Sequence, residues 1–459
     1  MSSVKGRLLA SFGANSLGRL FTTLIQVISV PLYLKHWGIH LYGEWILLST
    51  IPSYLGLSDI GFGSVAGNEM TMLMAKQRTE EALEVFQSIW LLTTGASLFV
   101  ATLLAVCIWF APLDRWMHLH SMTRIEARYV VLFLGLSALL SLQETLFQGA
   151  FRCVGRYAYG TTMKHLLMLG SFGVIIIPLI LGSAPPVVAV TYLVANAAGT
   201  LVLWFLLRNK VTWIRFGVRH ARWRAVRRLA LPAVSIMSVP LSNLLSLQGI
   251  LVIVGHVLGP VAVVTFNTAR TVSRSAAQAM QLINNAVWPE FSAAFGAENM
   301  ALARKLHRRA CQLSISLCLF VILIIAIFGR YVWSAWTIGK VPTDGILLDI
   351  LLVQLLVSSL WYTSSVVPLS TNNHKDMAKV LLISSILSLA LSWGLMRLPW
   401  LGLRGAAIGL VLGDLINAVY IVRASLKLLD ERLPDFLSGI VQIPKLRNSK
   451  PAVYPKPTG

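Results

Sequence analysis

The stretch that decides the fold runs from Val261 to Phe291 and reads VAVVTFNTARTVSRSAAQAMQLINNAVWPEF. At about 1.5 Å of rise per residue it is long enough to cross a bilayer as one helix, yet one of its sides is polar. The polar residues recur mostly at steps of three and four: Asn267, Arg270, Thr271, Arg274, Gln278, Gln281 and Asn285. Such spacing places them on one helical face. Lipid does not tolerate that face, so it must line a protein interior or a water-filled cavity.

The composition of the whole chain agrees with a protein of the membrane. Hydrophobic residues make up 56% and charged residues only 12% of the 459 residues, which excludes an ordinary soluble enzyme. Apolar runs predict twelve transmembrane helices, near 9–34, 42–64, 85–110, 128–150, 160–182, 186–207, 229–257, 261–287, 309–330, 345–370, 377–398 and 404–427. The fold class is therefore an all-α, polytopic membrane protein.

The net charge of +21 would suggest a nucleic-acid partner in a soluble chain, so the placement of the charge matters. With the N-terminus in the cytoplasm, 28 of the 39 Lys and Arg residues fall in inner segments and 8 in outer ones. This bias follows the positive-inside rule and predicts that both termini are cytoplasmic. It explains most of the charge without nucleic acid. The remaining three residues, Arg19, Arg270 and Arg274, fall inside predicted spans.

Two tight outer turns indicate an internal repeat. One lies at Gly38 in PLYLKHWGIHLYGEW and the other at Gly259 in VGHVLGPVAVV, 221 residues later. Six helices separate the copies, and because six is even both halves enter the membrane in the same sense, as a parallel repeat. A chance alignment of hydrophobic helices is the alternative. The predicted organisation is an N-terminal six-helix lobe (1–207), a basic cytoplasmic and amphipathic linker (208–228), a second lobe (229–430) and a flexible cytoplasmic tail (431–459).

The arginines inside the predicted spans are the candidate functional residues. Arg19 lies about 15 Å from the inner end of its helix and Arg270 about 13 Å from the outer end of its own, near the middle of a core about 30 Å thick. Each costs on the order of 2.5–3.5 kcal/mol on the mildest insertion scale, so the three need a compensating partner.

Two interpretations of that partner stand side by side. In the first, the arginines form ion pairs with the intramembrane acids Asp59, Glu144 and Asp414. In the second, Arg19, Arg270 and Arg274 line a cationic cavity and bind phosphate oxygens, while the acids bind a coupling H⁺ or Na⁺. Five further polar residues are expected to line such a cavity: Asn15, Gln26, Asn267, Gln278 and Gln281.

No catalytic, metal or cofactor site is expected. The four cysteines show no metal-ligand spacing and are interpreted as small core residues. His118 and His120, two residues apart in an outer loop, are interpreted as solvated side chains. An H⁺ or Na⁺ gradient is the one driving force that the sequence leaves open.

Three segments resemble a known family. They are PLYLKHWGIHLYGEWILL (31–48), LGLSDIGFGS (55–64) and, in the second half, LSTNNHKDMAK (369–379). The chain resembles, over roughly residues 5–430, the bacterial polysaccharide-biosynthesis membrane proteins, the O-antigen and exopolysaccharide repeat-unit flippases. These belong to the multidrug/oligosaccharidyl-lipid/polysaccharide (MOP) exporter superfamily. The chain departs from the family in having few acidic residues near the midplane.

The resemblance implies two six-helix lobes around a central cavity in a multi-pass protein of the bacterial inner membrane. It implies alternating access that moves an undecaprenyl-diphosphate-linked oligosaccharide from the inner to the outer leaflet. The expected partners are that lipid-linked oligosaccharide, membrane lipids, and the polysaccharide polymerase and chain-length machinery. Because one chain supplies both lobes, a monomer is expected.

Two other functions compete with the flippase. A small-molecule exporter of the same superfamily would suit an acidic, aromatic cavity that binds organic cations. A membrane polysaccharide polymerase or glycosyltransferase would need catalytic groups on a sizeable outer loop, and the longest one, near 111–127, has little room for them.

Overall fold

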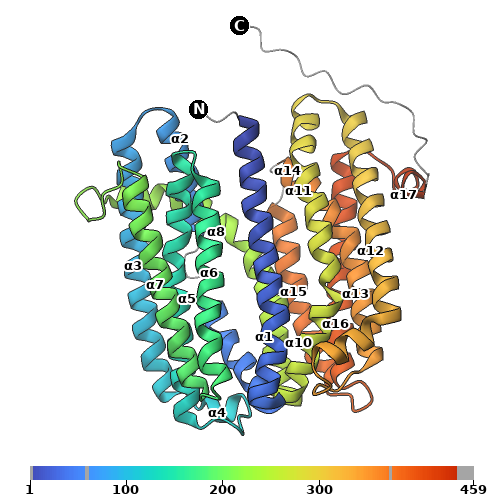
Figure 1. Ribbon diagram of the computed structural model, residues 1–459. Helices are drawn as coiled ribbons and strands as arrows, with labels where there is room; N and C mark the ends of the chain where they lie inside the picture. Colours follow the sequence, from blue (N-terminus) through green and yellow to red (C-terminus); the bar gives the residue numbers. More distant parts are fainter. Residues whose placement is uncertain (1–3, 57–60, 372–374, 442–459) are drawn as a thin grey trace.

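The computed structural model describes residues 4–56, 61–371 and 375–441, and these form a bundle of long helices (Figure 1). The N-terminal half contains α1 (Val4–Leu55), α2 (Phe62–Ala75), α3 (Thr79–Phe110), α4 (Leu113–Trp116), α5 (Arg124–Cys153), α6 (Tyr157–Ile180) and α7 (Pro185–Lys210). Next come α8 (Trp223–Leu244), the π-helical turn η2 (Leu245–Gly249) and α9 (Ile250–Leu258). The remainder contains α10 (Pro260–Ser273), α11 (Ser275–Gly296), α12 (Met300–Trp336), α13 (Gly345–Ser364), α14 (Val366–Ser370), α15 (Lys375–Met396), α16 (Leu403–Leu428) and α17 (Leu433–Val441). The predicted all-α class is confirmed.

Ten helices in the described part of the chain are long and apolar enough to cross a membrane. The sequence predicted twelve, and two features account for the difference. The first candidate span, Phe12–Leu55, joins two predicted helices across the kink at Gly38. The rod made of α10 and α11 carries the polar stripe and is not among the ten apolar spans.

The predicted repeat is confirmed by the backbone. Gly38 and Gly259 adopt the same conformation, with φ and ψ of 74° and 178° in one and 83° and 178° in the other. A side chain strains a backbone with this φ, which explains glycine at both turns. The spacing of 221 residues, 259 minus 38, also relates the positive-φ residues Gln77 and Glu298. The two halves therefore place equivalent turns at equivalent positions, as a repeat requires.

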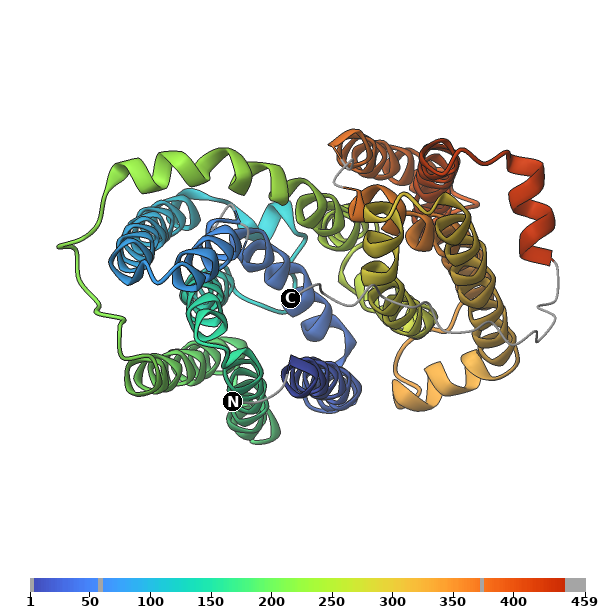
Figure 2. The same cartoon turned by 90° about the horizontal axis from the view of Figure 1, so that it is seen from above.

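Seen from above, the two halves form two bundles side by side, and α8 crosses from one to the other (Figure 2). Helix α8 contacts α2 and α3 in the first lobe and α15 in the second. The residues of the predicted linker between α7 and α8 are bound to α3, because the Gln87 side chain donates to the Arg215 carbonyl (2.7 Å) and accepts from the His220 amide (2.8 Å). Their place on the inner leaflet remains a prediction. Part of the predicted flexible tail is helical, as α17.

The two ends of the molecule differ in how the lobes meet. We call the end where α1 begins and α17 lies the terminal side, and the opposite end the α4 side (Figure 1). On the α4 side one buried core joins both lobes, including Leu34 of α1, Val130 of α5 and Phe266 of α10. In the part of the chain that the structure describes, one other cluster packs the start of α8, with Val226, Leu229 and Ala233, against the first lobe, and the remaining clusters lie within the second lobe. Apart from α8, the buried clusters therefore join the two lobes on the α4 side.

Hydrogen bonds reinforce this junction on the α4 side. The Trp336 indole donates to the Val27 carbonyl (2.8 Å), and Lys340 Nζ donates to the Leu34 carbonyl (2.9 Å). A Cβ at Gly43 would lie 2.3 Å from the Pro260 carbonyl oxygen, so only glycine allows α1 and α10 to approach so closely.

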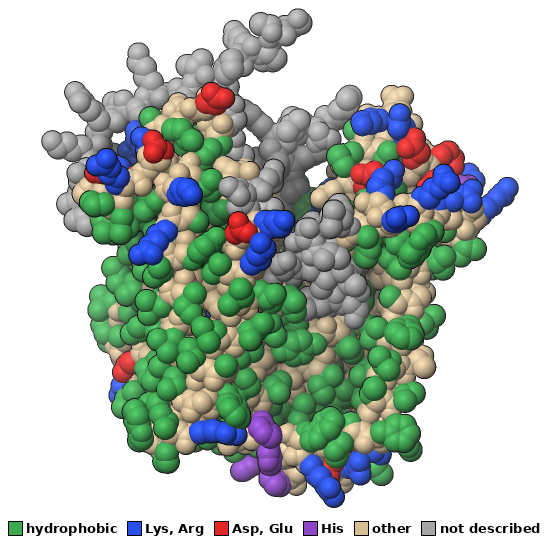
Figure 3. All heavy atoms as spheres, turned by 180° about the vertical axis from the view of Figure 1, so that it is seen from behind, with side chains coloured by type: hydrophobic (Ala, Val, Ile, Leu, Met, Phe, Trp, Pro, Cys, Tyr) green, Lys and Arg blue, Asp and Glu red, His purple; other side chains and the backbone are tan. Residues whose placement is uncertain are grey.

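The surface has the charge distribution of a membrane protein. On the face shown in Figure 3, hydrophobic side chains cover the broad middle of the molecule, and Lys and Arg side chains gather toward the terminal side with fewer at the α4 side. The cytoplasmic location of the terminal side remains a prediction from the positive-inside rule.

Candidate functional site

A cavity of 530 Å³ lies in the second lobe, and we call it the C-lobe cavity. Its lining comes from α8, η2, α10, α11, α13, α15 and α16, with Gln26 contributed by α1 of the other lobe. Gln26 Nε2 donates to the Thr271 hydroxyl (3.3 Å), which connects the two lobes at the edge of the cavity. The polar stripe of α10 and α11 faces this space, because Asn267, Arg270, Arg274 and Gln281 all line it.

Arg270 is buried, and no carboxylate among the described residues forms an ion pair with it. Its Nη1 donates to the Leu247 carbonyl (2.8 Å) and its Nη2 donates to Asn267 Oδ1 (3.1 Å). The guanidinium also lies 5.6 Å from the centre of the Phe266 ring. Leu247 belongs to the π-helical turn η2, and such turns occur frequently at functional sites. Neutral acceptors orient the cation but leave its positive charge in the cavity.

Arg274 occupies the break between α10 and α11, where it caps the first of the two helices. Its side chain is exposed and lines the cavity. Asp414 and Tyr362 lie within electrostatic range of it. Even so, no ion pair joins Arg270 or Arg274 to Glu144, Asp414 or another carboxylate within the described ranges, and Asp59 lies outside them.

Asp414 of α16 is held by neutral donors in the same cavity. It accepts hydrogen bonds from Gln354 Nε2 (2.6 Å), the Ser358 hydroxyl (2.7 Å) and the Trp361 indole (3.1 Å). These neutral donors, together with the nearby Asn417, fix the position of the carboxyl group. The cavity therefore holds one acidic and two basic side chains that form no ion pair with one another.

A second and smaller cavity lies in the first lobe, and we call it the N-lobe cavity. It has a volume of 220 Å³ and includes Asn15, Arg152 and Lys164 in its lining. Lys164 Nζ lies 3.1 Å from Glu144 Oε2. The other carboxylate oxygen of Glu144, Oε1, accepts a hydrogen bond from the Thr200 hydroxyl. Arg152 Nη1 donates to Asn68 Oδ1 (2.8 Å). The Glu144 carboxylate thus pairs with a lysine of its own lobe and not with any of the three predicted arginines.

Arg19 of α1 lines neither cavity. It is half-buried, and its Nη1 is enclosed without a hydrogen-bond partner among the described residues. Both Arg19 and Arg274 lie within electrostatic range of the Tyr362 phenol, which comes from the second lobe. Arg19 therefore lies on the side of α1 that faces the C-lobe cavity.

The predicted site residues are thus divided. Arg270, Arg274, Gln26, Asn267, Gln281 and Asp414 meet at the C-lobe cavity. Asn15 and the Glu144–Lys164 pair belong to the first lobe. Asp59 lies outside the described residues, and so does the side chain of Gln278.

Sequence reasoning missed the contribution of α13. Gln354, Ser358, Trp361 and Tyr362 all line the C-lobe cavity. Their spacing of four, three and one residues places them near one face of an otherwise apolar helix, which is the signal that would have found them. It also missed Glu44, which is buried and accepts from the backbone amides of His120 (2.6 Å), Ser121 (2.7 Å) and Met122 (2.8 Å). Glu44 is structural, because it holds the loop after α4 against the bundle.

No family model and no curated protein matches the chain. Solved structures do match, over most of its length. A multidrug resistance MATE family transporter of the MOP superfamily, in an inward-facing conformation, gives a TM-score of 0.69 with 16% identity, covering 88% of this chain and 97% of that one. The chain has the MATE fold.

Two further neighbours extend the comparison. A MATE family transporter in an outward-facing conformation gives a TM-score of 0.62 at 16% identity, with 96% and 97% of the two chains covered. A MOP superfamily transporter from Pyrococcus furiosus, whose reversed binding-pocket polarity suggests a different function, gives 0.58 at 16% identity, with 93% and 96% covered. At this identity the likeness shows the fold alone.

Proposed function

We propose that the protein is a membrane transporter whose substrate carries an anionic head, and that this head is the diphosphate of a lipid-linked oligosaccharide. The sequence resemblance supports undecaprenyl diphosphate as the lipid and cell-surface polysaccharide or exopolysaccharide as the product. The protein would move the repeat unit from the inner to the outer leaflet of the bacterial inner membrane. The observation that carries the proposal is Arg270, which is buried at the C-lobe cavity and whose hydrogen-bond partners in the described part of the chain are all neutral.

Among the described residues, Arg270 has no counterion. A buried cation without an anion is costly, and an anionic ligand removes that cost when it binds. A guanidinium suits phosphate oxygens because its donors lie in one plane and bind two oxygens together. Arg270 is oriented by two of its donors, and the exposed Arg274 beside it supplies others. The pair therefore favours a diphosphate over a single carboxylate.

Alternating access supplies the movement. The junction on the α4 side consists of the shared buried core and of the Trp336 and Lys340 hydrogen bonds to α1. Rocking one lobe against the other would open this side and close the terminal side. Neighbours of the same fold exist in both conformations. An H⁺ or Na⁺ gradient remains the expected driving force, and Asp414 is the predicted acid that lines the same cavity as the arginines.

A second candidate function is the export of small organic cations. It is favoured by Asp414, Trp361 and Tyr362, which line the C-lobe cavity together. Aromatic rings and a carboxylate attract a cation. The Pyrococcus furiosus neighbour, in which reversed pocket polarity suggests a different function, supports reading the substrate class from cavity charge. The C-lobe cavity has two arginines and one aspartate in its lining, so its charges favour an anionic substrate.

Reconstitution into vesicles distinguishes these functions. We expect a fluorescent diphosphate-linked sugar lipid to change leaflets, with Arg274→Gln slowing the exchange and Arg330→Gln leaving it unchanged. Arg330 is the matched control, because it lies at the α4 end of α12, exposed and paired with Asp349. Efflux of a cationic dye without leaflet exchange would instead support the exporter. New glycosidic bonds would support the polymerase.

A further inference from the structure

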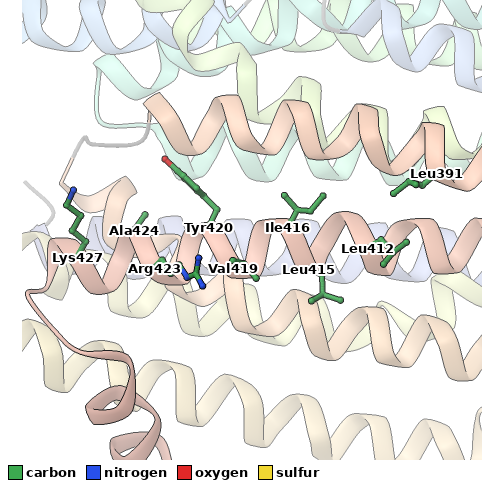
Figure 4. Close-up of a pocket in the computed structure, with 9 residues that line it drawn as sticks. All are labelled: Leu391, Leu412, Leu415, Ile416, Val419, Tyr420, Arg423, Ala424 and Lys427. Carbon is green, nitrogen blue, oxygen red and sulfur yellow. The ribbon is translucent and has the colours of Figure 1, made fainter.

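Besides the two cavities, the molecule has a large depression on its outer surface. It lies along α16, with Leu391 contributed by α15, and has a volume of 870 Å³ (Figure 4). We call it the α16 groove. Leu412, Leu415, Ile416 and Val419 line its length, and each is 36–48% exposed. They recur at steps of three and four, so they form one apolar strip on the face of α16.

Two cations lie at one end of this strip. Arg423 and Lys427 are one helical turn apart, both are exposed, and both line the groove (Figure 4). Neither forms an ion pair or a side-chain hydrogen bond with any residue that the structure describes. The lining contains no acidic residue. An apolar strip that ends in two unpaired cations complements a molecule with an apolar chain and an anionic head.

The depth of the strip matches one leaflet. From Leu412 to Arg423 the helix advances eleven residues, or about 16 Å at 1.5 Å each, and half of a hydrocarbon core is about 15 Å. Arg423 and Lys427 lie in the last two turns of α16, on the terminal side. Tyr420 comes between the strip and the cations, and such aromatic rings favour the level of the headgroups.

We propose that the α16 groove binds an anionic diacyl phospholipid from the leaflet on the terminal side. An acyl chain lies along Leu412, Ile416 and Val419, and the phosphate lies between Arg423 and Lys427. A zwitterionic lipid fits less well, because it brings a cation of its own to a site that already has two. The site is separate from the transport cavity, since α16 presents Asp414 and Asn417 to that cavity and the apolar strip to the groove.

Native mass spectrometry of the delipidated full-length protein tests the proposal. The probes are phosphatidylglycerol and phosphatidylcholine with identical acyl chains. Each basic residue near an anionic lipid contributes roughly a fivefold preference, so we expect wild-type protein to retain phosphatidylglycerol at least about tenfold better. The R423Q/K427Q double variant should retain the two lipids equally. The matched control is K305Q/R309Q, an exposed pair with the same spacing near the start of α12, which should keep the preference.

A second pair of variants tests the apolar strip. Val419→Trp fills it and should reduce retention of both lipids, whereas Ile383→Trp, on an exposed lipid-facing position of α15 outside the groove, should not. Equal retention of the two lipids by wild-type protein would overturn the proposal, and so would loss of the preference in K305Q/R309Q. Displacement of phosphatidylglycerol by an equal amount of polyprenyl phosphate would assign the groove to the transported lipid instead. Leaflet exchange, measured separately, tests the transport function independently.

Discussion

The two cavities occupy the two halves of one repeat, yet their charges are arranged differently. In the N-lobe cavity Lys164 lies 3.1 Å from Glu144, so this cation is neutralised within the lobe, while Arg152 donates to the neutral Asn68. In the C-lobe cavity Arg270 has neutral partners, and Asp414 is held by neutral donors. The repeat therefore reproduces the helices but not the electrostatics.

Because of this difference, we expect an anion to bind more tightly in the C-lobe cavity than beside Lys164. A cation that is already paired gains little from a charged ligand, because the ligand must compete with the carboxylate beside it. A cation held by a carbonyl and an amide keeps most of its attraction for an incoming phosphate. Variants that add or remove a charge in each cavity test this difference.

The largest effect is expected from Arg270→Gln. Hydrogen bonds to charged groups contribute about 1.5–3 kcal/mol each, so the loss of one or two of them should slow leaflet exchange roughly 10-fold to 100-fold or more. Exchange of the diphosphate lipid in vesicles measures it, with the amount of inserted protein as the control for folding. A wild-type rate in correctly inserted protein would remove Arg270 from the site.

A smaller loss is expected when the C-lobe cavity is made to resemble the other one. Asn267→Asp places a carboxylate where Asn267 Oδ1 now lies 3.1 Å from Arg270 Nη2. The new ion pair should lower affinity for the diphosphate about tenfold while leaving thermal stability equal or higher. Asn68→Asp is the matched control, because Asn68 accepts from Arg152 in the same way in the first lobe. Equal losses in both variants would contradict the distinction between the cavities.

Asp414→Asn should change affinity in the opposite direction. It removes the negative charge from the C-lobe cavity but keeps an acceptor for Gln354, Ser358 and Trp361. We expect the diphosphate to bind a few-fold more tightly, as measured by ligand titration in detergent, and gradient-driven transport to fall if this acid couples the ion. Weaker binding of the anion would show that Asp414 orients the substrate and does not repel it.

The smallest effect is expected in the first lobe. Replacing both members of the pair, with Glu144→Gln and Lys164→Met, removes equal and opposite charges, so leaflet exchange should stay within about twofold of wild type. Thermal unfolding should show the double variant to be more stable than Glu144→Gln alone, since the single change leaves a lysine without its carboxylate. A tenfold fall in exchange would give the N-lobe cavity a role in transport.

Much of the architecture could be predicted from the sequence because helical periodicity and the repeat are local patterns. The turns at Gly38 and Gly259, 221 residues apart, predicted two equivalent lobes, and the two glycines adopt the same backbone conformation. The polar stripe on residues 261–291 predicted a cavity inside the membrane. Arg270, Arg274, Asn267 and Gln281 indeed line one.

Which residues line the same cavity could not be predicted in the same way. Periodicity shows that Asn15 and Arg270 each lie on a polar face, but it does not show which polar faces meet. Packing rotates each helix and chooses its neighbours, which placed Asn15 in one cavity and Arg270 in another. The same packing gave Glu144 a lysine partner and brought the α13 face with Gln354 into the site.

The sequence by itself determined the class of protein, the repeat and the presence of arginines within the bilayer, since each follows from composition or spacing along one helix. Only the tertiary structure decided that Arg270 is oriented by the Leu247 carbonyl and not by a carboxylate. That hydrogen bond depends on how α10 packs against the π-helical turn. The sequence of a single helix does not specify this packing. The physical reason is that a charge acquires its partner only when several helices have packed together.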